Sequence, residues 1–142
     1  MTVSNPSFVF SLERVREVRA HEEDMAREAF AASLSLRARG VALLADAKAR
    51  AAAAREQAVA ETSPRSGAAL ISAQAWLERV QRSQEQAALE LDRRSAELEE
   101  RRQVLERLKD RKRQAHHLET NRRDAVALDE VAMTGHVRRL AS

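Results

Sequence analysis

Residues 84–108 read QEQAALELDRRSAELEERRQVLERL, and this stretch decides the fold. Leucine recurs at every seventh residue, at Leu91, Leu98 and Leu105, in a background of Glu, Arg and Gln. Apolar residues with this spacing stay on one side of a helix and are typical of a left-handed coiled coil. The stretch therefore predicts one face of a long helix that packs against another helix.

The seven-residue repeat continues on both sides of this stretch. One series runs from Leu70 to Met133 and a companion series from Ala73 to His136, and twelve of their twenty positions are apolar. The polar positions gather towards the C-terminus, where a buried unpaired charge would be costly, so we expect looser packing there. The first series is Leu70, Leu77, Gln84, Leu91, Leu98, Leu105, Lys112, Glu119, Val126 and Met133, and the second is Ala73, Val80, Ala87, Arg94, Arg101, Leu108, Ala115, Arg122, Asp129 and His136.

Three breaks interrupt the helical pattern. The first precedes Ser11, which has the chemistry of an N-cap, while Phe10 and Val15 have the spacing of a hydrophobic staple. The second is residues 62–67, the only internal stretch that combines Pro, Gly and Ser, and it predicts a turn. The third is residues 134–135, Thr-Gly, which is typical of a helix C-terminus.

These breaks predict a single coiled-coil domain over residues 1–142, with a helix over about 11–61, a turn over about 62–68 and a helix over about 69–133. Helices of roughly 75 and 100 Å need a partner along their length, and the nearest is each other. We expect an all-α, long two-helix antiparallel coiled-coil hairpin with an overhanging C-terminal helix end, in which residue i faces residue 130 − i. The 3–4 spacing predicts the seam of the first helix at Leu12, Val15, Val18, Glu22, Met25, Ala29, Ala32, Leu36, Arg39 and Leu43.

Composition excludes several other classes of protein. The 142 residues include 28 alanines, no cysteine and only 3% aromatic residues, which favours long helices over a wide globular core and argues against strands. No charge-free run approaches the roughly 20 apolar residues that span a bilayer, and no secretory signal opens the chain. We therefore expect a cytoplasmic protein with no transmembrane segment.

Residues for catalysis or metal binding do not form recognisable sets. His21 and Glu22 start a zincin-like pattern, but position 25 is Met rather than His. No glycine-rich phosphate loop occurs, and paired catalytic carboxylates need a cleft that a helical hairpin does not offer. We therefore expect no enzymatic activity, no cofactor and no metal site.

Two features remain as candidates for binding. Residues 107–123 contain seven basic and two acidic side chains, which suits contact with an acidic protein, or else forms a solvated helix face. The stretch has no interleaved aromatic residue, which argues against nucleic acid as a partner. Trp76, the only tryptophan, lies near the turn, where it either covers the edge of the seam or anchors a partner at the tip of the hairpin. The basic residues are Arg107, Lys109, Arg111, Lys112, Arg113, Arg122 and Arg123.

Three stretches resemble the flagellar FliJ family. Residues 8–19, FVFSLERVREVR, are similar to its opening signature F-x-F-x-L-E-R-V-L-x-x-R. Residues 105–111, LERLKDR, are similar to its L-E-K-L-K-E-R run. Arg122 and Arg123, with residues 127–132 (ALDEVA), are similar to its R-R-E-x-K-E-L-D-E-x-A ending. The order and spacing of the three also agree, so the resemblance spans nearly the whole chain.

The resemblance implies a coiled-coil stalk of the flagellar type III protein export apparatus. Such a protein binds the hexameric export ATPase, contacts the cytoplasmic linker region of the export gate and escorts export chaperones. It works in the cytoplasm at the flagellar base, held at the inner face of the membrane only through its partners. Carried over by these motifs, the ATPase-contacting residues are Leu12, Arg14, Arg19, Leu105, Leu108, Lys109, Arg111, Arg122, Arg123, Asp129 and Glu130.

Other functions stay open at this point. The equivalent stalk of a virulence-type III secretion system has nearly the same sequence requirements. A structural homodimeric coiled coil without a hairpin would place Arg94 and Arg101 opposite acidic residues of the other chain. A nucleic-acid-binding basic helix is the least favoured, because acidic residues are interspersed with the basic ones.

Overall fold

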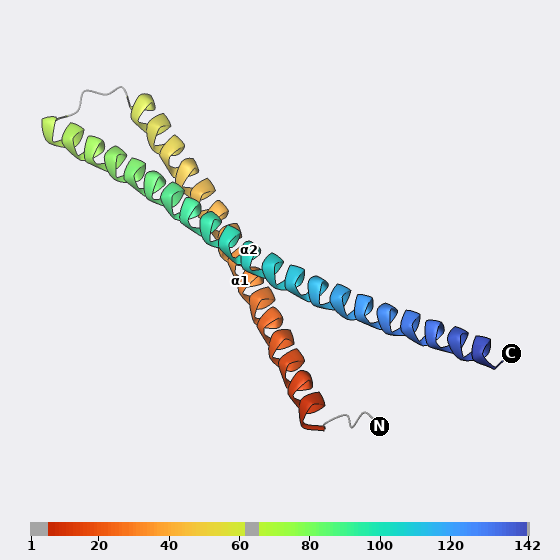
Figure 1. Ribbon diagram of the computed structural model, residues 1–142. Coiled ribbons are helices and arrows are strands. Elements are labelled where there is room, and N and C mark those ends of the chain that lie inside the picture. Colours follow the sequence, from red (N-terminus) through yellow and green to blue (C-terminus); the bar gives the residue numbers. More distant parts are fainter. Residues whose placement is uncertain (1–5, 62–65, 142) are drawn as a thin grey trace. The chain divides into compact units, whose positions relative to one another are not determined.

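The computed structural model describes residues 6–61 and 66–141, and residues 6–10 only in their backbone. These residues form two long helices, α1 (Pro6–Ala60) and α2 (Gly67–Leu140), with no strand among them (Figure 1). The expected all-helical architecture of two long helices is confirmed. Four residues of the predicted turn, 62–65, lie outside the described residues.

The N-terminal boundary of α1 differs from the sequence prediction. The helix begins at Pro6, so Ser11 lies inside it and the N-cap assigned to Ser11 is wrong. Proline suits the first turn of a helix, because its missing N–H would have no partner there and its φ is already helical. The predicted staple between Phe10 and Val15 involves a side chain outside those described.

The serine before α2 provides the cap that starts this helix. The N–H of Ala69 donates to the Oγ of Ser66 at 3.3 Å, and the N–H of Leu70 donates to the Ser66 carbonyl at 3.1 Å. A side-chain oxygen that accepts from the third helical N–H is the arrangement of an N-cap. As a result α2 begins at Gly67, two residues before the predicted start.

At its other end α2 continues past the predicted stop to Leu140. Gly135 has no positive φ, so it does not form the left-handed cap that ends many helices. The hydroxyl of Thr134 donates within the helix to the carbonyls of Glu130 and Val131, at 3.1 and 3.0 Å. Threonine therefore satisfies its hydroxyl without interrupting the helix.

The chain divides into two compact units, Met1–Gln103 and Val104–Ser142. In the first unit α1 packs against the beginning of α2. The Arg94 guanidinium donates to the Leu36 carbonyl at 2.9 Å, and Arg37 donates to the Ser95 hydroxyl at 3.3 Å. Nearer the turn, Ala51 and Ala54 form a buried cluster with Val80 and Leu77.

These contacts run in opposite directions along the two helices. The residue numbers in the pairs Leu36–Arg94, Arg37–Ser95 and Ala54–Val80 add up to 130, 132 and 134. The values agree, within about one helical turn, with the predicted value of 130. Within the first unit the packing is therefore consistent with a hairpin. The hydrogen bond from Arg94 to Leu36 is formed within one chain. In the alternative of a homodimer without a hairpin, Arg94 would instead face acidic residues of the other chain.

Within the first unit, the side of α2 that faces α1 follows the predicted seven-residue repeat. Val80 is buried, and most of the half-buried side chains between it and the end of this unit occupy seam positions. The predicted apolar pattern therefore identifies the shielded face of this part of α2 correctly. The half-buried seam positions are Gln84, Ala87, Leu91, Arg94 and Leu98.

The seam of α1 is one residue away from the predicted one. Its most deeply buried positions include Ser33, Gly40, Ala47 and Ala54, which are small and seven residues apart. Small side chains let two helix backbones approach closely; a Cβ on Gly40 would lie 3.2 Å from the Cδ of Arg94. The larger residues of the predicted seam, Val15, Val18, Met25, Leu36 and Leu43, are instead 40–54% exposed. The prediction of this face is therefore wrong by about 100° of helix rotation.

Candidate functional site

The candidate ATPase-contacting residues fall into both units of the chain. Leu12, Arg14 and Arg19 belong to the first unit and are exposed on α1. The other eight belong to the second unit. Leu105 is only 7% exposed and Leu108 is half-buried, so these two are the least accessible to a partner. The remaining six are exposed on α2: Lys109, Arg111, Arg122, Arg123, Asp129 and Glu130.

The basic stretch 107–123 has an exposed surface, and part of its charge is compensated within the helix. Arg113 donates to Asp110 one turn earlier, and Arg123 donates to Glu119 at 3.1 Å. Exposed pairs of this kind contribute only a few tenths of a kcal/mol to helix stability. Their main effect is to hold the guanidinium groups along the helix surface.

Three cations of this stretch have no such compensation. Within the part of the chain that the structure describes, the side chains of Arg107, Lys109 and Arg122 are exposed and form no hydrogen bond or ion pair. An exposed guanidinium without an internal partner can form a two-pronged contact with a carboxylate of another protein. These residues are therefore the strongest candidates for electrostatic contact in the second unit.

Several candidate residues share one side of α2. Arg122, Arg123 and Glu130 line a shallow hollow with Val126 between them. Their spacing of three to four residues places them on adjacent turns, so one partner surface can contact them together. Asp129 does not line this hollow. The side combines two cations, an acidic group and an apolar centre, which suits a protein partner.

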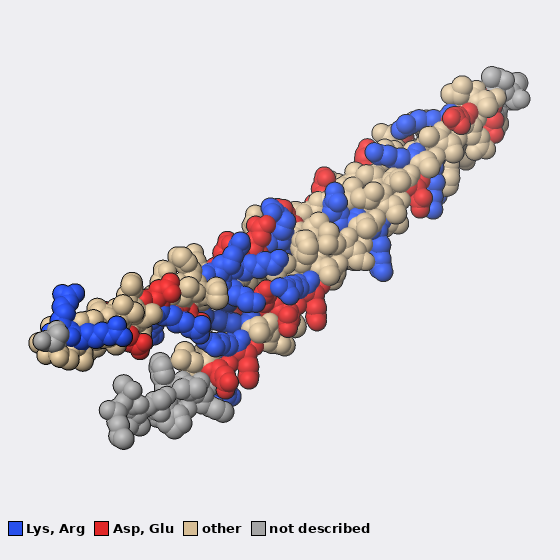
Figure 2. Space-filling model, turned by 90° about the vertical axis from the view of Figure 1, so that its right-hand side faces the viewer, with Lys and Arg blue, Asp and Glu red and all other residues tan. Residues whose placement is uncertain are grey.

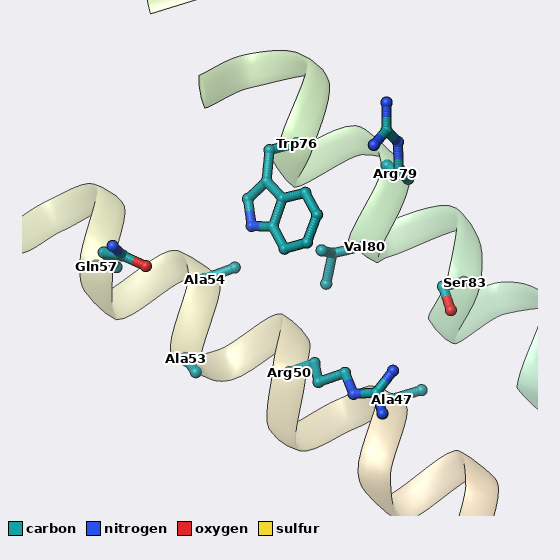
Figure 3. A pocket seen from close by; sticks show the side chains of 9 residues that line it. All are labelled: Ala47, Arg50, Ala53, Ala54, Gln57, Trp76, Arg79, Val80 and Ser83. Atoms are coloured by element: carbon teal, nitrogen blue, oxygen red, sulfur yellow. The ribbon is translucent and has the colours of Figure 1, made fainter. Parts of the chain in front are cut away.

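Trp76 lies in a groove between the two helices of the first unit. Figure 3 shows its indole extending from α2 towards α1, beside Val80 and facing Ala54. The groove has a volume of about 400 Å³, and Trp76 remains 54% exposed. The ring therefore covers part of the seam and still offers an apolar surface to a partner.

Two arginines flank this groove and were not singled out by the sequence. Arg50 of α1 and Arg79 of α2 line it from opposite helices. Neither forms an ion pair or hydrogen bond with the described residues. The two arginines are 29 positions apart in the chain. The sequence therefore does not indicate that they line the same groove unless the register of the two helices is known.

The charge pattern is mixed on the face of the molecule that Figure 2 draws. Figure 2 shows basic and acidic side chains beside one another over the face in view. Many are paired along α2, as in Glu99, whose pKa is lowered below its ordinary value by a hydrogen bond from Arg102. The face in view therefore does not show the continuous basic field that nucleic-acid-binding proteins use.

Metal-binding groups do not gather in the described ranges 6–61 and 66–141, where no three His, Cys, Asp or Glu side chains lie close enough to share an ion. In the same ranges neither helix has an apolar stretch long enough to cross a bilayer. No protein-family model matches the chain, and neither does any curated protein or solved structure.

Proposed function

We propose that the chain is a non-enzymatic coiled-coil component of the flagellar type III protein export apparatus. In this proposal it binds the hexameric export ATPase as a stalk, couples the ATPase to the export gate and escorts export chaperones. It works in the cytoplasm at the flagellar base and associates with the inner face of the membrane through its partners.

The observation that carries the proposal is the exposed, cationic surface of the second unit. Arg107, Lys109 and Arg122 have no partner among the described side chains, and Leu118 and Val126, which lie one turn before and one turn after Arg122, are more than half exposed. Exposed apolar residues that lie beside uncompensated charges mark surfaces for protein partners. The resemblance of residues 8–19, 105–111 and 122–132 to the FliJ family supports the export ATPase as that partner.

The proposal includes a finer description of the fold. The stalk is an antiparallel coiled-coil hairpin that keeps a constant register along its length. α2 has 74 residues and α1 has 55, so at that register the C-terminal end of α2 overhangs. At that register Arg122, which has no partner among the described side chains, lies just before the overhang, where it could contact acidic side chains that line an opening.

The groove beside Trp76 is the proposed contact for the export gate. Its apolar centre and its two flanking arginines, Arg50 and Arg79, suit an acidic segment with an apolar residue. The gate linker would thus meet the first unit at Trp76, whereas eight of the eleven proposed ATPase-contacting residues belong to the second unit. The two contacts are separately testable because they use different residues.

Binding of purified proteins tests this function. The full chain is titrated onto the export ATPase and, separately, onto the cytoplasmic domain of the export gate, and ATP hydrolysis is measured alongside. We expect a saturable complex with each protein and a changed rate of hydrolysis. Absence of binding to the ATPase, with the chain fully helical by circular dichroism, would contradict the proposal.

A further inference from the structure

An apolar face of α1 remains uncovered in the first unit. We call it the outer face of α1. Its four large apolar residues, Val18, Met25, Leu36 and Leu43, are 53, 53, 40 and 54% exposed. Regular apolar spacing over 25 residues is typical of a helix face that packs against another helix. The outer face consists of Val18, Glu22, Met25, Ala29, Ala32, Leu36, Arg39 and Leu43.

The outer face is distinct from the face that contacts α2. Ala32 and Arg39 of the outer face come directly before the buried residues Ser33 and Gly40 in the chain. A step of one residue corresponds to a rotation of about 100° around the helix axis. A helix in a four-helix bundle contacts two neighbours at a similar angle. α1 can therefore bind α2 and another helix at the same time.

We infer that the outer face binds the outer face of a second copy of this chain, with the two α1 helices antiparallel and residue i facing residue 61 − i. This inference goes beyond the proposed export function and does not depend on it. In this register Val18 faces Leu43 of the second copy, and Met25 faces Leu36 of the second copy. Ala29 faces Ala32 at the centre, so every outer-face residue except Glu22 and Arg39 meets an apolar residue.

The two charges of the outer face select this register. At this register Glu22 meets Arg39 of the second copy, and two-fold symmetry forms the pair twice. A shift by one heptad in one direction places Glu22 opposite Ala32, and a shift in the other direction places it opposite Asp46. Both shifts lose the pair, and polar residues within a seam fix register in this way. This self-complementarity favours a second copy over an unrelated helix as the partner.

Light scattering of the purified full chain tests the dimer. We expect a mass of twice 15.9 kDa at high concentration, with reversible dissociation on dilution. The single variants Glu22→Arg and Arg39→Glu bring like charges together in the dimer, so each should associate at least about tenfold more weakly. The matched control Arg55→Glu, an exposed position outside the outer face, should associate as the wild type does.

Mixing the two single variants provides the decisive result. In their heterodimer the arginine introduced at position 22 meets the glutamate introduced at position 39, and the two native side chains, Glu22 and Arg39, form the second pair. Equimolar mixing should therefore restore a dimer at concentrations where neither variant forms one alone. The double variant Glu22→Arg/Arg39→Glu should dimerise by itself.

Three results would overturn the inference. The first is a wild-type chain that stays monomeric up to its solubility limit. The second is a pair of single variants that dimerise as the wild type does. The third is a mixture and a double variant that both stay monomeric where the wild type is a dimer.

Discussion

The guanidinium of Arg94 donates a hydrogen bond to the carbonyl oxygen of Leu36, at 2.9 Å, across the two helices of the first unit. Arg94 occupies a seam position where the repeat would otherwise place an apolar residue. Gly40 leaves the space for it, since a Cβ there would lie 3.2 Å from the Arg94 Cδ. Glu90, which accepts from Arg94 at 3.2 Å, satisfies a second donor of the guanidinium. A charge in the seam is thereby bonded to both helices and helps to fix their register.

Replacement of this arginine should weaken the packing of the two helices. We expect Arg94→Ala to lower the free energy of unfolding by about 1–2 kcal/mol, because a partly buried, charged hydrogen bond is lost. Arg93→Ala is the matched control: among the described residues the exposed Arg93 pairs with Glu90 alone, so its removal should change stability by less than about 0.5 kcal/mol. Urea denaturation measures both, and equal effects would contradict the role given to Arg94.

A large side chain at Gly40 should have the opposite effect from the same change at Gly135. Gly40→Leu brings new atoms against Arg94 and Leu91, so we expect a loss of about 2 kcal/mol in stability. Nothing lies within 4 Å of a Cβ on Gly135, so Gly135→Leu should raise helix content through its better helix propensity. Thermal melting followed by circular dichroism tests the pair. A tolerated Gly40→Leu would show that the helices do not approach closely there.

The buried cluster near the turn should contribute measurably to stability despite its small residues. Val80 packs against Ala51 and Ala54, and we expect Val80→Ala to lower the free energy of unfolding by about 1–2 kcal/mol. Val59→Ala removes the same atoms from a side chain that is 79% exposed, so its effect should stay within about 0.5 kcal/mol. Chemical denaturation compares the two variants, and a similar loss in both would argue against a packed cluster.

The sequence predicts the packed face of α2 much better than that of α1. In α2 the shielded positions include Leu91, Leu98 and Leu105, whose seven-residue spacing is directly visible. In α1 the most buried residues, such as Gly40 and Ala47, are not the most hydrophobic ones; they are buried because their size admits the other helix. A pattern based on hydrophobicity therefore selects Met25 and Leu36, which the structure leaves exposed.

The candidate binding surfaces are predicted to different extents for a similar reason. The basic stretch 107–123 is continuous in the chain, so counting charges suffices to find it. The groove at Trp76 also needs Arg50 and Arg79, which come from different helices. Only the register of the helices brings them together, and the register depends on contacts such as that of Arg94 with Leu36.

Charge reversal in the second unit measures the central claim most directly. We expect Arg122→Glu/Arg123→Glu to weaken binding to the hexameric export ATPase at least about tenfold, because acidic groups on the partner would meet like charges. Lys48→Glu/Arg55→Glu makes the same change in net charge at exposed positions of α1 and serves as the control. The account predicts that the control binds as the wild type does and that all three proteins keep the same helix content. Equal affinity of the wild type and Arg122→Glu/Arg123→Glu would contradict the account.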